Sequence, residues 1–236
     1  MFYLGRRLLA VILPDYCWAC GGKRLDGERV WCLTCELEFP ICTHEKWPFH
    51  RVDGVFRGRF PFQAALAWSL YFEPSGLREL IHTLKYEQRG FIGLELGRKM
   101  GEAWLRMPAS TLETPVNAVI PVPIHRKKKR KRGYNQSERL ARGFSDVTGI
   151  PVVETVLERR SLGKGQSKSN RLNRWLNVQR EFRVRPGNAL DGGHVLLMDD
   201  VITTGATIES CAIQLQLAGA SHVSVLAVGY TSSRPQ

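Results

Sequence analysis

Residues 195 to 207 read Val-Leu-Leu-Met-Asp-Asp-Val-Ile-Thr-Thr-Gly-Ala-Thr, and this stretch decides the fold. The continuous apolar run Val195 to Met198 is typical of a parallel strand that is buried between helices on both faces. Asp199 and Asp200 follow at the carboxyl end of that strand, where open α/β sheets bind ligands. The apolar pattern of residues 208–217 predicts a helix behind the turn at Gly205. We therefore expect an α/β protein with a ligand site at this strand end.

The residue types in this stretch favour a sugar phosphate as the ligand. Backbone N–H groups at the start of the helix, together with the threonine hydroxyls beside them, form a cradle for a phosphate. Carboxylates accept hydrogen bonds from a diol but repel a phosphate, so the acids and the cradle must face different parts of one ligand. The alternative is a buried strand, an acidic N-cap and a threonine-rich turn that bind nothing.

The same stretch resembles the phosphoribosyl pyrophosphate (PRPP) fingerprint of the type I phosphoribosyltransferases. The resemblance implies a mainly parallel sheet flanked by helices. It also implies that two catalytic acids meet the ribose 2′- and 3′-hydroxyls, and that the following loop holds the 5′-phosphate. The residues that it assigns to PRPP are Asp199, Asp200, Val201, Thr203, Thr204, Gly205, Ala206 and Thr207.

Length and composition bound the possible classes of protein. The chain has 236 residues, 43% of them hydrophobic, which suits one domain of ordinary size with a small appendage. No apolar run reaches the roughly 18 residues that span a bilayer, so we expect no transmembrane segment. We predict a short helix or packing segment at residues 4–13, with membrane or partner contact as the alternative. The net charge of +12 predicts a polyanionic ligand or partner.

Cysteines predict a metal site near the N-terminus. Cys17-x-x-Cys20 and Cys32-x-x-Cys35 can present four thiolates to one tetrahedral Zn²⁺, and four sulfurs leave no open position, so the zinc would be structural. About fifty residues bury little core, so metal binding would supply folding free energy. A redox pair and free thiols are the alternatives.

The clustering of these cysteines also bears on compartment and domain boundaries. Disulfides of a secreted protein would be spread through the domain, so the cluster favours a reducing, cytoplasmic environment. Cys42 and His44 can replace a zinc ligand or bind nothing. We assign residues 1–50 to the N-terminal segment and zinc-binding module, and residues 51–236 to the phosphoribosyltransferase-like domain.

Between the module and the basic segment, the sequence predicts a hairpin and two helices. Aromatic and β-branched residues at 54–72 favour the hairpin. Leu77 to Leu84 and residues 91–105 have helical spacing. His82 and Lys85 are expected on a solvated face, with a catalytic role as the alternative.

Residues 116–122 form a second apolar strand that ends at Pro121-Val122-Pro123, because proline cannot donate to a sheet ladder. In the phosphoribosyltransferases the corresponding strand end leads to the pyrophosphate loop. The resemblance thus implies that Val122 and Pro123 lie near the leaving group.

Seven consecutive cations follow His125. Because like charges repel, we expect this run to be mobile without an anion. Three interpretations stay open: a solvated loop, a flap that closes on pyrophosphate, and a contact for nucleic-acid phosphates. The candidate cations for the pyrophosphate or nucleic-acid side are Arg126, Lys127, Lys128, Lys131, Arg132, Arg159 and Arg160.

Gly133-Tyr134-Asn135-Gln136-Ser137 predicts the start of a further helix and, with Arg132, resembles the Arg-Gly-Phe-Asn-Gln motif of the ComF family of phosphoribosyltransferase-like proteins. Further matches are the double Cys-x-x-Cys module, Leu84-Lys85-Tyr86, Gln166, Arg174 and Asn177. The chain departs from the family pattern at three places. Cys42 has no Cys-x-x-Cys partner, a usual threonine is Gly163, and a usual Ala-Phe is Glu181-Phe182. The change at 163 lies in a predicted flexible loop, Ser161 to Asn173, and the change at 181 follows that loop.

The resemblance implies a function linked to competence and DNA uptake, with two main hypotheses. In the first, the protein transfers ribose 5-phosphate from PRPP to an unidentified acceptor, with Mg²⁺ held mainly by the ligand's diol and pyrophosphate oxygens. In the second, it is a factor that handles incoming single-stranded DNA and uses the fold for binding or regulation. A third possibility is that PRPP is a signal that is bound without turnover.

Overall fold

The computed structural model of the chain describes residues 16–25, 29–42, 48–160, 181–187, 190 and 192–231. Several predictions fall outside these ranges: those for the segment 4–13, the loop 161–173, His44, Gln166, Arg174 and Asn177. None of the helices within the described ranges is long and apolar enough to cross a bilayer.

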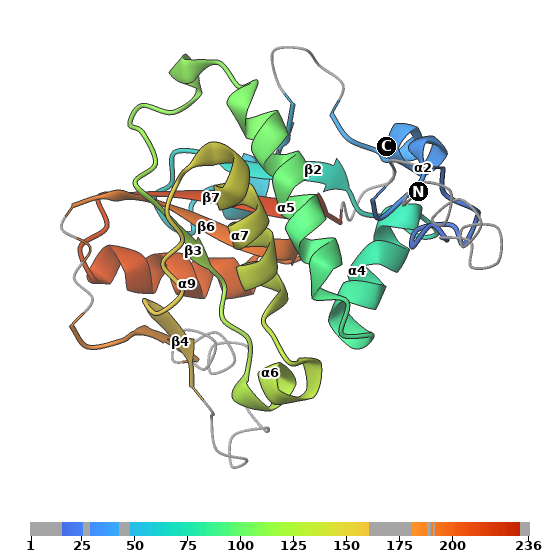
Figure 1. Ribbon diagram of the computed structural model, residues 1–236. Helices are drawn as coiled ribbons and strands as arrows, with labels where there is room; N and C mark the ends of the chain where they lie inside the picture. Colours follow the sequence, from blue (N-terminus) through green and yellow to red (C-terminus); the bar gives the residue numbers. More distant parts are fainter. Residues whose placement is uncertain are drawn as a thin grey trace, which may run out of the picture.

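A five-stranded sheet in the order β1-β2-β7-β6-β3 forms the centre of the molecule (Figure 1). In that order the strands are His50–Arg51, Ala65–Leu70, His222–Tyr230, His194–Ile202 and Ala118–Pro121. Neighbouring strands from β2 to β3 are parallel, whereas β1 pairs with β2 in the antiparallel sense. The prediction of a mainly parallel sheet flanked by helices is confirmed.

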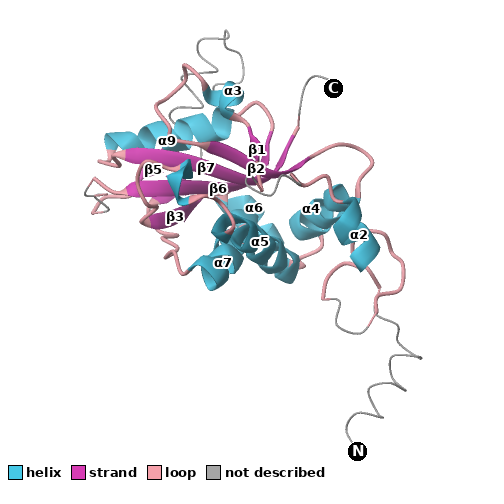
Figure 2. Cartoon of the chain, turned by 90° about the horizontal axis from the view of Figure 1, so that it is seen from above, coloured by secondary structure: helices cyan, strands magenta, loops and turns pink. Residues whose placement is uncertain are grey.

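Helices cover both faces of the sheet (Figure 2). One face carries α4 (Gly76–Tyr86), α5 (Gly90–Leu105) and α7 (Gln136–Thr148), and the other carries α9 (Ala206–Leu217). Within β6, Leu196 and Met198 belong to the first core, whereas Val195 and Leu197 belong to the second. The strand is apolar without alternation because both of its faces are buried.

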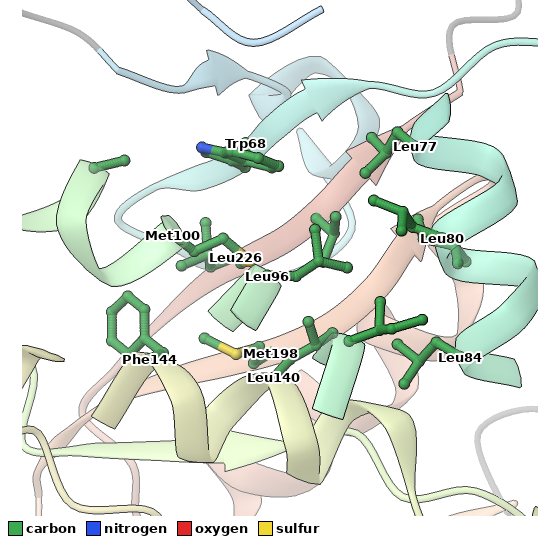
Figure 3. Packing of buried hydrophobic residues seen from close by; sticks show 14 of the residues in the cluster. Trp68, Leu77, Leu80, Leu84, Leu96, Met100, Leu140, Phe144, Met198 and Leu226 are labelled. Carbon is green, nitrogen blue, oxygen red and sulfur yellow. The ribbon is translucent and has the colours of Figure 1, made fainter. Parts of the chain in front are cut away.

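Helices α5 and α7 pack against each other at the distance that two glycines permit. A Cβ atom on Gly97 would lie 2.1 Å from the carbonyl oxygen of Leu140, and one on Gly143 would lie 2.0 Å from that of Leu94. Leu96, Met100, Leu140 and Phe144 fill the space between these helices and the sheet (Figure 3). This packing fixes the start of α7 beside the carboxyl end of β6.

The cysteine module, which includes α2 (Leu33–Glu38), packs against α4 and α5 and shares their core. The indole of Trp18 meets Phe91 edge to face at 5.7 Å, and the guanidinium of Arg89 lies 5.0 Å from the centre of the Trp18 ring. Figure 2 shows α4 between α2 and the sheet. The proposed boundary at residue 50 stays a prediction.

The segment 54–72 differs from the predicted hairpin. Only β2 is a strand within it, and α3 (Asp53–Phe56) is a helical turn that follows β1. Oδ1 of Asp53 accepts a hydrogen bond from the backbone N–H of Ala65 at 2.9 Å, which ties this turn to the start of β2. The aromatic residues that suggested a strand instead form a cluster, with Phe56, Phe60 and Phe62 in mutual ring contact.

The remaining elements are short. They are η1 (Ala109–Thr111), α6 (Arg126–Arg132), and a two-stranded antiparallel ribbon of β4 (Leu157–Arg159) and β5 (Phe182–Val184). The ribbon lies outside the main sheet, and α6 directly follows the end of β3.

Candidate functional site

The two acids of the opening stretch lie within the last four residues of β6, which runs to Ile202 and is thus longer than the predicted strand. Asp200 is 5% exposed, and its Oδ2 accepts no hydrogen bond from the residues that the structure describes. Asp199 is partly buried, and its Oδ1 accepts hydrogen bonds from Ser137 Oγ at 3.0 Å and from the backbone N–H of Asp200 at 2.8 Å. The protein thus holds Asp199 in place. Oδ2 of Asp200 has an ion-pair contact with Lys85 Nζ at 3.0 Å but no aligned hydrogen bond from the described residues, so it can still accept one from a ligand.

Burial and the neighbouring charge of Asp200 raise the pKa of Asp199 from 3.8 to about 7. The hydrogen bonds from Asp200 N–H and Ser137, together with the charge of Lys85, lower this pKa but do not offset the increase. Near neutral pH, Asp199 therefore exchanges between a form that only accepts hydrogen bonds and a form that can also donate one.

Lys85 departs from the prediction of a solvated face. Its Nζ lies 3.0 Å from Oδ2 of Asp200, and its side chain is 24% exposed. His82, one turn earlier on α4, is exposed as predicted, and its ring packs on Tyr86 at 4.7 Å. Helical spacing predicts which residues share a face of α4 but not which strand end that face meets, so the contact of Lys85 with Asp200 was not predicted.

The Gly-Tyr-Asn-Gln-Ser segment at 133–137 joins three elements around the acids. Tyr134 Oη donates to the carbonyl of Leu84 in α4 at 2.5 Å, and Asn135 Nδ2 donates to the carbonyl of Val122 after β3 at 2.9 Å. Ser137, which is fully buried, reaches Asp199 in β6. Asn135 also caps α7, since its side chain accepts from the N–H of Ser137. The segment therefore fixes the positions of α4 and of the ends of β3 and β6 relative to one another.

The predicted phosphate cradle is a sharp turn that leads into α9. Gly205 has φ of +75° at the N-cap, and a Cβ atom there would lie 2.6 Å from a ring carbon of Phe56 in α3, so only glycine fits. Thr203 and Thr204 are exposed beside it. Their hydroxyls and the unpaired N–H groups of the first turn of α9 can surround a phosphate.

Arg59 is a further residue at this cradle that the sequence pattern did not reveal. Its Nη1 donates to the carbonyl of Thr204 at 2.6 Å and lies 3.5 Å from a carboxylate oxygen of Glu209. It thereby places a cation beside the predicted phosphate position.

The basic run after His125 forms helix α6, so the interpretation of this run as a solvated loop is wrong. The His125 side chain caps its start by accepting from the N–H of Lys127, and Gly133, with φ of +79°, ends it. Lys129 Nζ reaches Glu138 of α7 at 2.7 Å, which anchors the helix and relieves part of the repulsion between like charges. The glycine after a run of good helix formers was the available signal for this helix.

Two adjoining clefts gather most of the predicted pyrophosphate-side cations. One, of about 220 Å³, lies at the end of β3 and includes Pro123, Arg126, Lys129, Asn135 and Arg159 in its lining. The other, of about 450 Å³, is lined by His125, Arg126, Lys127, Arg130, Glu158, Arg159, Arg160 and Arg183. Lys128 and Lys131 line neither of these two clefts.

Val122 and Arg132 lie near these clefts but make other contacts. Val122 is buried, and its carbonyl accepts from Asn135. Arg132 stacks on Tyr86 at 5.5 Å and donates to Oε1 of Gln136 at 2.6 Å.

Arg159 contacts Glu181, which stands where the family resemblance implies alanine, and also contacts Phe182. Arg159 Nη2 lies 2.6 Å from Oε1 of Glu181, and its guanidinium lies 5.3 Å from the centre of the Phe182 ring. These contacts hold Arg159 on the β4–β5 ribbon, at the rim shared by the two clefts.

The four cysteines of the two knuckles come together as predicted, with their Sγ atoms all within 4.8 Å of one another. The Cys17–Cys35 and Cys20–Cys32 sulfur pairs are each 3.8 Å apart. A tetrahedron with zinc–sulfur bonds of about 2.3 Å has sulfur–sulfur edges of about 3.8 Å, so this set fits one zinc ion.

Backbone groups prepare one of these thiols for metal binding. Burial alone would raise the pKa of Cys17, but N–H groups of neighbouring residues, including Cys32, outweigh it and bring the pKa to about 7. Cys42 lies outside the cluster.

Comparisons with curated proteins reveal relatives along most of the chain. The DNA utilization protein YhgH of Salmonella typhimurium is 30% identical over 226 residues, which cover 90% of this chain and 96% of that protein. Competence protein F of Haemophilus influenzae is 30% identical over 219 residues, covering 89% and 94% of the two chains. Competence protein ComFC of Bacillus subtilis is 29% identical over 94 residues, covering 40% and 36%. No protein-family model matches the chain.

Solved structures give a partial likeness. The allosteric regulatory enzyme of purine biosynthesis is 24% identical with a TM-score of 0.39, covering 58% of this chain and 25% of that one. Adenine phosphoribosyl transferase from Trypanosoma brucei is 14% identical with a TM-score of 0.38, covering 69% and 70%. These TM-scores are too low to assign the fold, so its description rests on the strand order of this chain.

Proposed function

This chain belongs to the ComF family, which includes competence protein F and the DNA utilization protein YhgH, and on that premise we propose that it binds PRPP and transfers the ribose 5-phosphate to an acceptor. The observation that carries the proposal is the end of β6, where two acids precede a glycine turn and the start of α9. Oδ2 of Asp200 is buried and ion-paired with Lys85 but accepts no aligned hydrogen bond from the described residues, so a ribose hydroxyl could donate to it.

The cradle supports the other end of the same ligand. The 5′-phosphate would accept hydrogen bonds from Thr203, Thr204 and Thr207, from Ala206 N–H and from the N-terminus of α9, with Arg59 adding positive charge. Gly205 and Val201 would contribute backbone that approaches the ligand closely.

Bond cleavage at C1′ would separate charge, and the residues around the site suit each part. Positive charge develops on the ribose ring, beside Asp199 and Asp200 in their ionised forms. Negative charge develops on the departing pyrophosphate, where Arg126, Lys129 and Arg159 line the cleft at the end of β3. Mg²⁺ bound to the ligand's diol and pyrophosphate oxygens would supply further neutralisation of the leaving group.

We also propose that the four-cysteine cluster binds one structural Zn²⁺, because its sulfur spacing fits a closed tetrahedral site. The shared core with α4 would then make the metal a support for Lys85 and the acid pair as well. A cytoplasmic location, where thiols stay reduced, is part of the same proposal.

A second candidate function, single-stranded DNA binding in competence or DNA uptake, is favoured by the cation-lined cleft between α6 and the β4–β5 ribbon. Its lining includes six Lys or Arg residues and one acid, Glu158. Such a surface suits a nucleic-acid backbone, and binding there would weaken steeply with salt. Names of relatives refer to competence and DNA utilization.

Isothermal titration of PRPP with Mg²⁺ tests the first proposal. Wild type should bind, Asp200→Asn should bind at least about tenfold more weakly, and Asp146→Asn, on the exposed surface of α7, should bind as wild type. Absent binding, or equal binding by Asp200→Asn, would reject the PRPP site. Pyrophosphate release on addition of candidate bases or amines would then separate transfer from binding without turnover.

Single-strand binding needs its own test. A Lys127→Ala, Arg130→Ala variant should lose affinity for single-stranded DNA, whereas a Lys128→Ala, Lys131→Ala variant should keep most of it, because the second pair lines neither cleft. Binding that is insensitive to salt, or equal losses in both variants, would argue against this cleft as the binding surface.

A further inference from the structure

Lys85 supplies the cation that faces the acid pair at the end of β6. Its Nζ lies 3.0 Å from Oδ2 of Asp200, in a contact where the lysine side chain is 24% exposed and the aspartate side chain is 8% exposed. Among the described residues, no other Lys, Arg or His forms an ion pair with Asp199 or Asp200. Within the described part of the chain, Lys85 is therefore the only cation that forms an ion pair with this pair of carboxylates.

The contact between Lys85 and Asp200 leaves hydrogen-bonding capacity on both sides. Oδ2 of Asp200 is buried and accepts no aligned hydrogen bond from any residue that the structure describes, although the ammonium of Lys85 is close. A lysine ammonium has three N–H donors and no acceptor. Buried acceptors without partners are rare in native proteins, and they often mark a place that a ligand or water completes. Asp199 differs, because the protein already donates two hydrogen bonds to its Oδ1.

Packing fixes the position of Lys85. The apolar face of α4, formed by Leu77, Leu80, Ile81 and Leu84, is at most 1% exposed. The carbonyl of Leu84, the residue before Lys85, also accepts the hydrogen bond from Tyr134. The lysine therefore reaches the strand end from a helix that is held on two sides, so little further ordering would be needed when a ligand binds.

We propose that Lys85 is a ligand-binding residue of this site, which offsets the charge of Asp200 and donates its remaining N–H groups to the oxygen atoms of a phosphorylated pentose. The inference rests on the proposed function, because it concerns the same site. Two carboxylates without a cation would repel a phosphate-bearing ligand, whereas the lysine lowers that repulsion from within the protein. Since this cation belongs to the chain, ribose 5-phosphate would bind without a divalent metal.

Titration with ribose 5-phosphate in the presence of EDTA tests this role, because this ligand lacks the pyrophosphate that chelates Mg²⁺. We expect Lys85→Met to weaken the affinity by roughly tenfold or more, the size expected for loss of hydrogen bonds from a charged group. Lys85→Arg, which keeps the charge, should restore most of the affinity.

Lys99→Met is the matched control for this experiment. Lys99 is 27% exposed, and its Nζ pairs with Glu36 at 2.7 Å on the side of α5 that meets the cysteine module. Its replacement also removes a half-buried, ion-paired lysine, but it should leave the affinity for ribose 5-phosphate unchanged. A purely structural effect would instead weaken binding equally in both variants.

Wild-type affinity in Lys85→Met, or an equal loss in Lys99→Met, would overturn the assignment. If Lys85→Met does not fold, as judged by circular dichroism, Lys85→Gln and Lys85→Arg carry the test. Equal affinities of these two variants would overturn it too, because only the arginine keeps the charge. A wild-type protein that binds neither ribose 5-phosphate nor PRPP would contradict the proposed function itself, which distinguishes that failure from an error about Lys85.

Discussion

The hydroxyl of Ser137, in the first turn of α7, donates a 3.0 Å hydrogen bond to Oδ1 of Asp199 at the end of β6. Ser137 is fully buried, and the contact joins a helix to a strand end that lies far away in the sequence. The hydrogen bond lowers the pKa of Asp199 against the larger effect of burial. It thus links the Gly-Tyr-Asn-Gln-Ser segment to the charge state of the proposed ribose site.

Replacement of this hydroxyl should weaken PRPP binding without abolishing it. We expect Ser137→Ala to reduce the affinity by roughly threefold to tenfold, since one hydrogen bond to a charged acceptor is lost. The variant should also shift the pH dependence of binding upward, because the pKa of Asp199 rises. Titration calorimetry across a pH series measures both effects. Ser145→Ala, two turns later on α7, is the control, and an equal effect there would count against the role of Ser137.

The raised pKa of Asp199 predicts that this group destabilises the ligand-free protein as pH rises. In the unfolded chain the carboxyl titrates near 3.8, whereas in the folded protein it titrates at about 7. Between these values the folded state binds more protons, so the contribution of Asp199 to the free energy of unfolding falls as pH rises through this window.

Asp199→Asn removes this titration and should therefore stabilise the protein relative to wild type more at pH 8 than at pH 4. Thermal melting of both proteins across this range measures the difference. A constant difference between the two melting temperatures would show that Asp199 has an ordinary pKa.

Gly205→Ala should destabilise the protein and disrupt the phosphate cradle. The new Cβ would meet Phe56 at 2.6 Å in a backbone conformation with φ of +75°. Gly149→Ala is the matched control, because its φ is +73° and a Cβ there meets nothing within 4 Å. We expect a loss of about 1–2 kcal/mol in the control from the backbone alone, and about 3 kcal/mol or more for Gly205→Ala. Equal losses in chemical denaturation would contradict the clash.

Zinc should bind in a one-to-one ratio and stabilise the cysteine module. Cys17→Ser should lose the metal and lower the melting temperature, whereas Cys42→Ser should keep the metal because Cys42 lies outside the four-sulfur cluster. Metal analysis of purified protein, with melting curves before and after chelation, tests this. Metal-free wild type with an unchanged melting curve would reject the zinc site, and metal loss in Cys42→Ser would bring Cys42 into the ligand set.

Local patterns were sufficient to predict the main elements of this fold. The unbroken apolar run before Asp199 indicated a strand buried on both faces, and the structure has β6 between two cores. The spacing of the two Cys-x-x-Cys pairs indicated one metal site, and their sulfurs converge. In each case the residues that define the feature are neighbours in the sequence, so the pattern contains most of the information.

The errors concern contacts between elements. Lys85 was predicted on a solvated face because helical spacing does not reveal which strand end a helix reaches, yet it pairs with Asp200. A solvated loop was one interpretation of the basic run because its own charges repel, but the run forms a helix in which Lys129 pairs with Glu138 of a different helix. The aromatic residues after Asp53 suggested strands, but they pack on one another as a cluster. In all three cases, tertiary contacts determine the local structure.

A crystal structure of the protein with PRPP and Mg²⁺ tests the central claim most directly. We predict that the ribose hydroxyls lie within hydrogen-bond distance of Asp199 and Asp200, with the 5′-phosphate against Thr203 to Thr207. The pyrophosphate should face the cleft that Arg126 and Arg159 line. Density for PRPP at any other surface, or no density at a concentration that saturates binding in solution, would contradict the account.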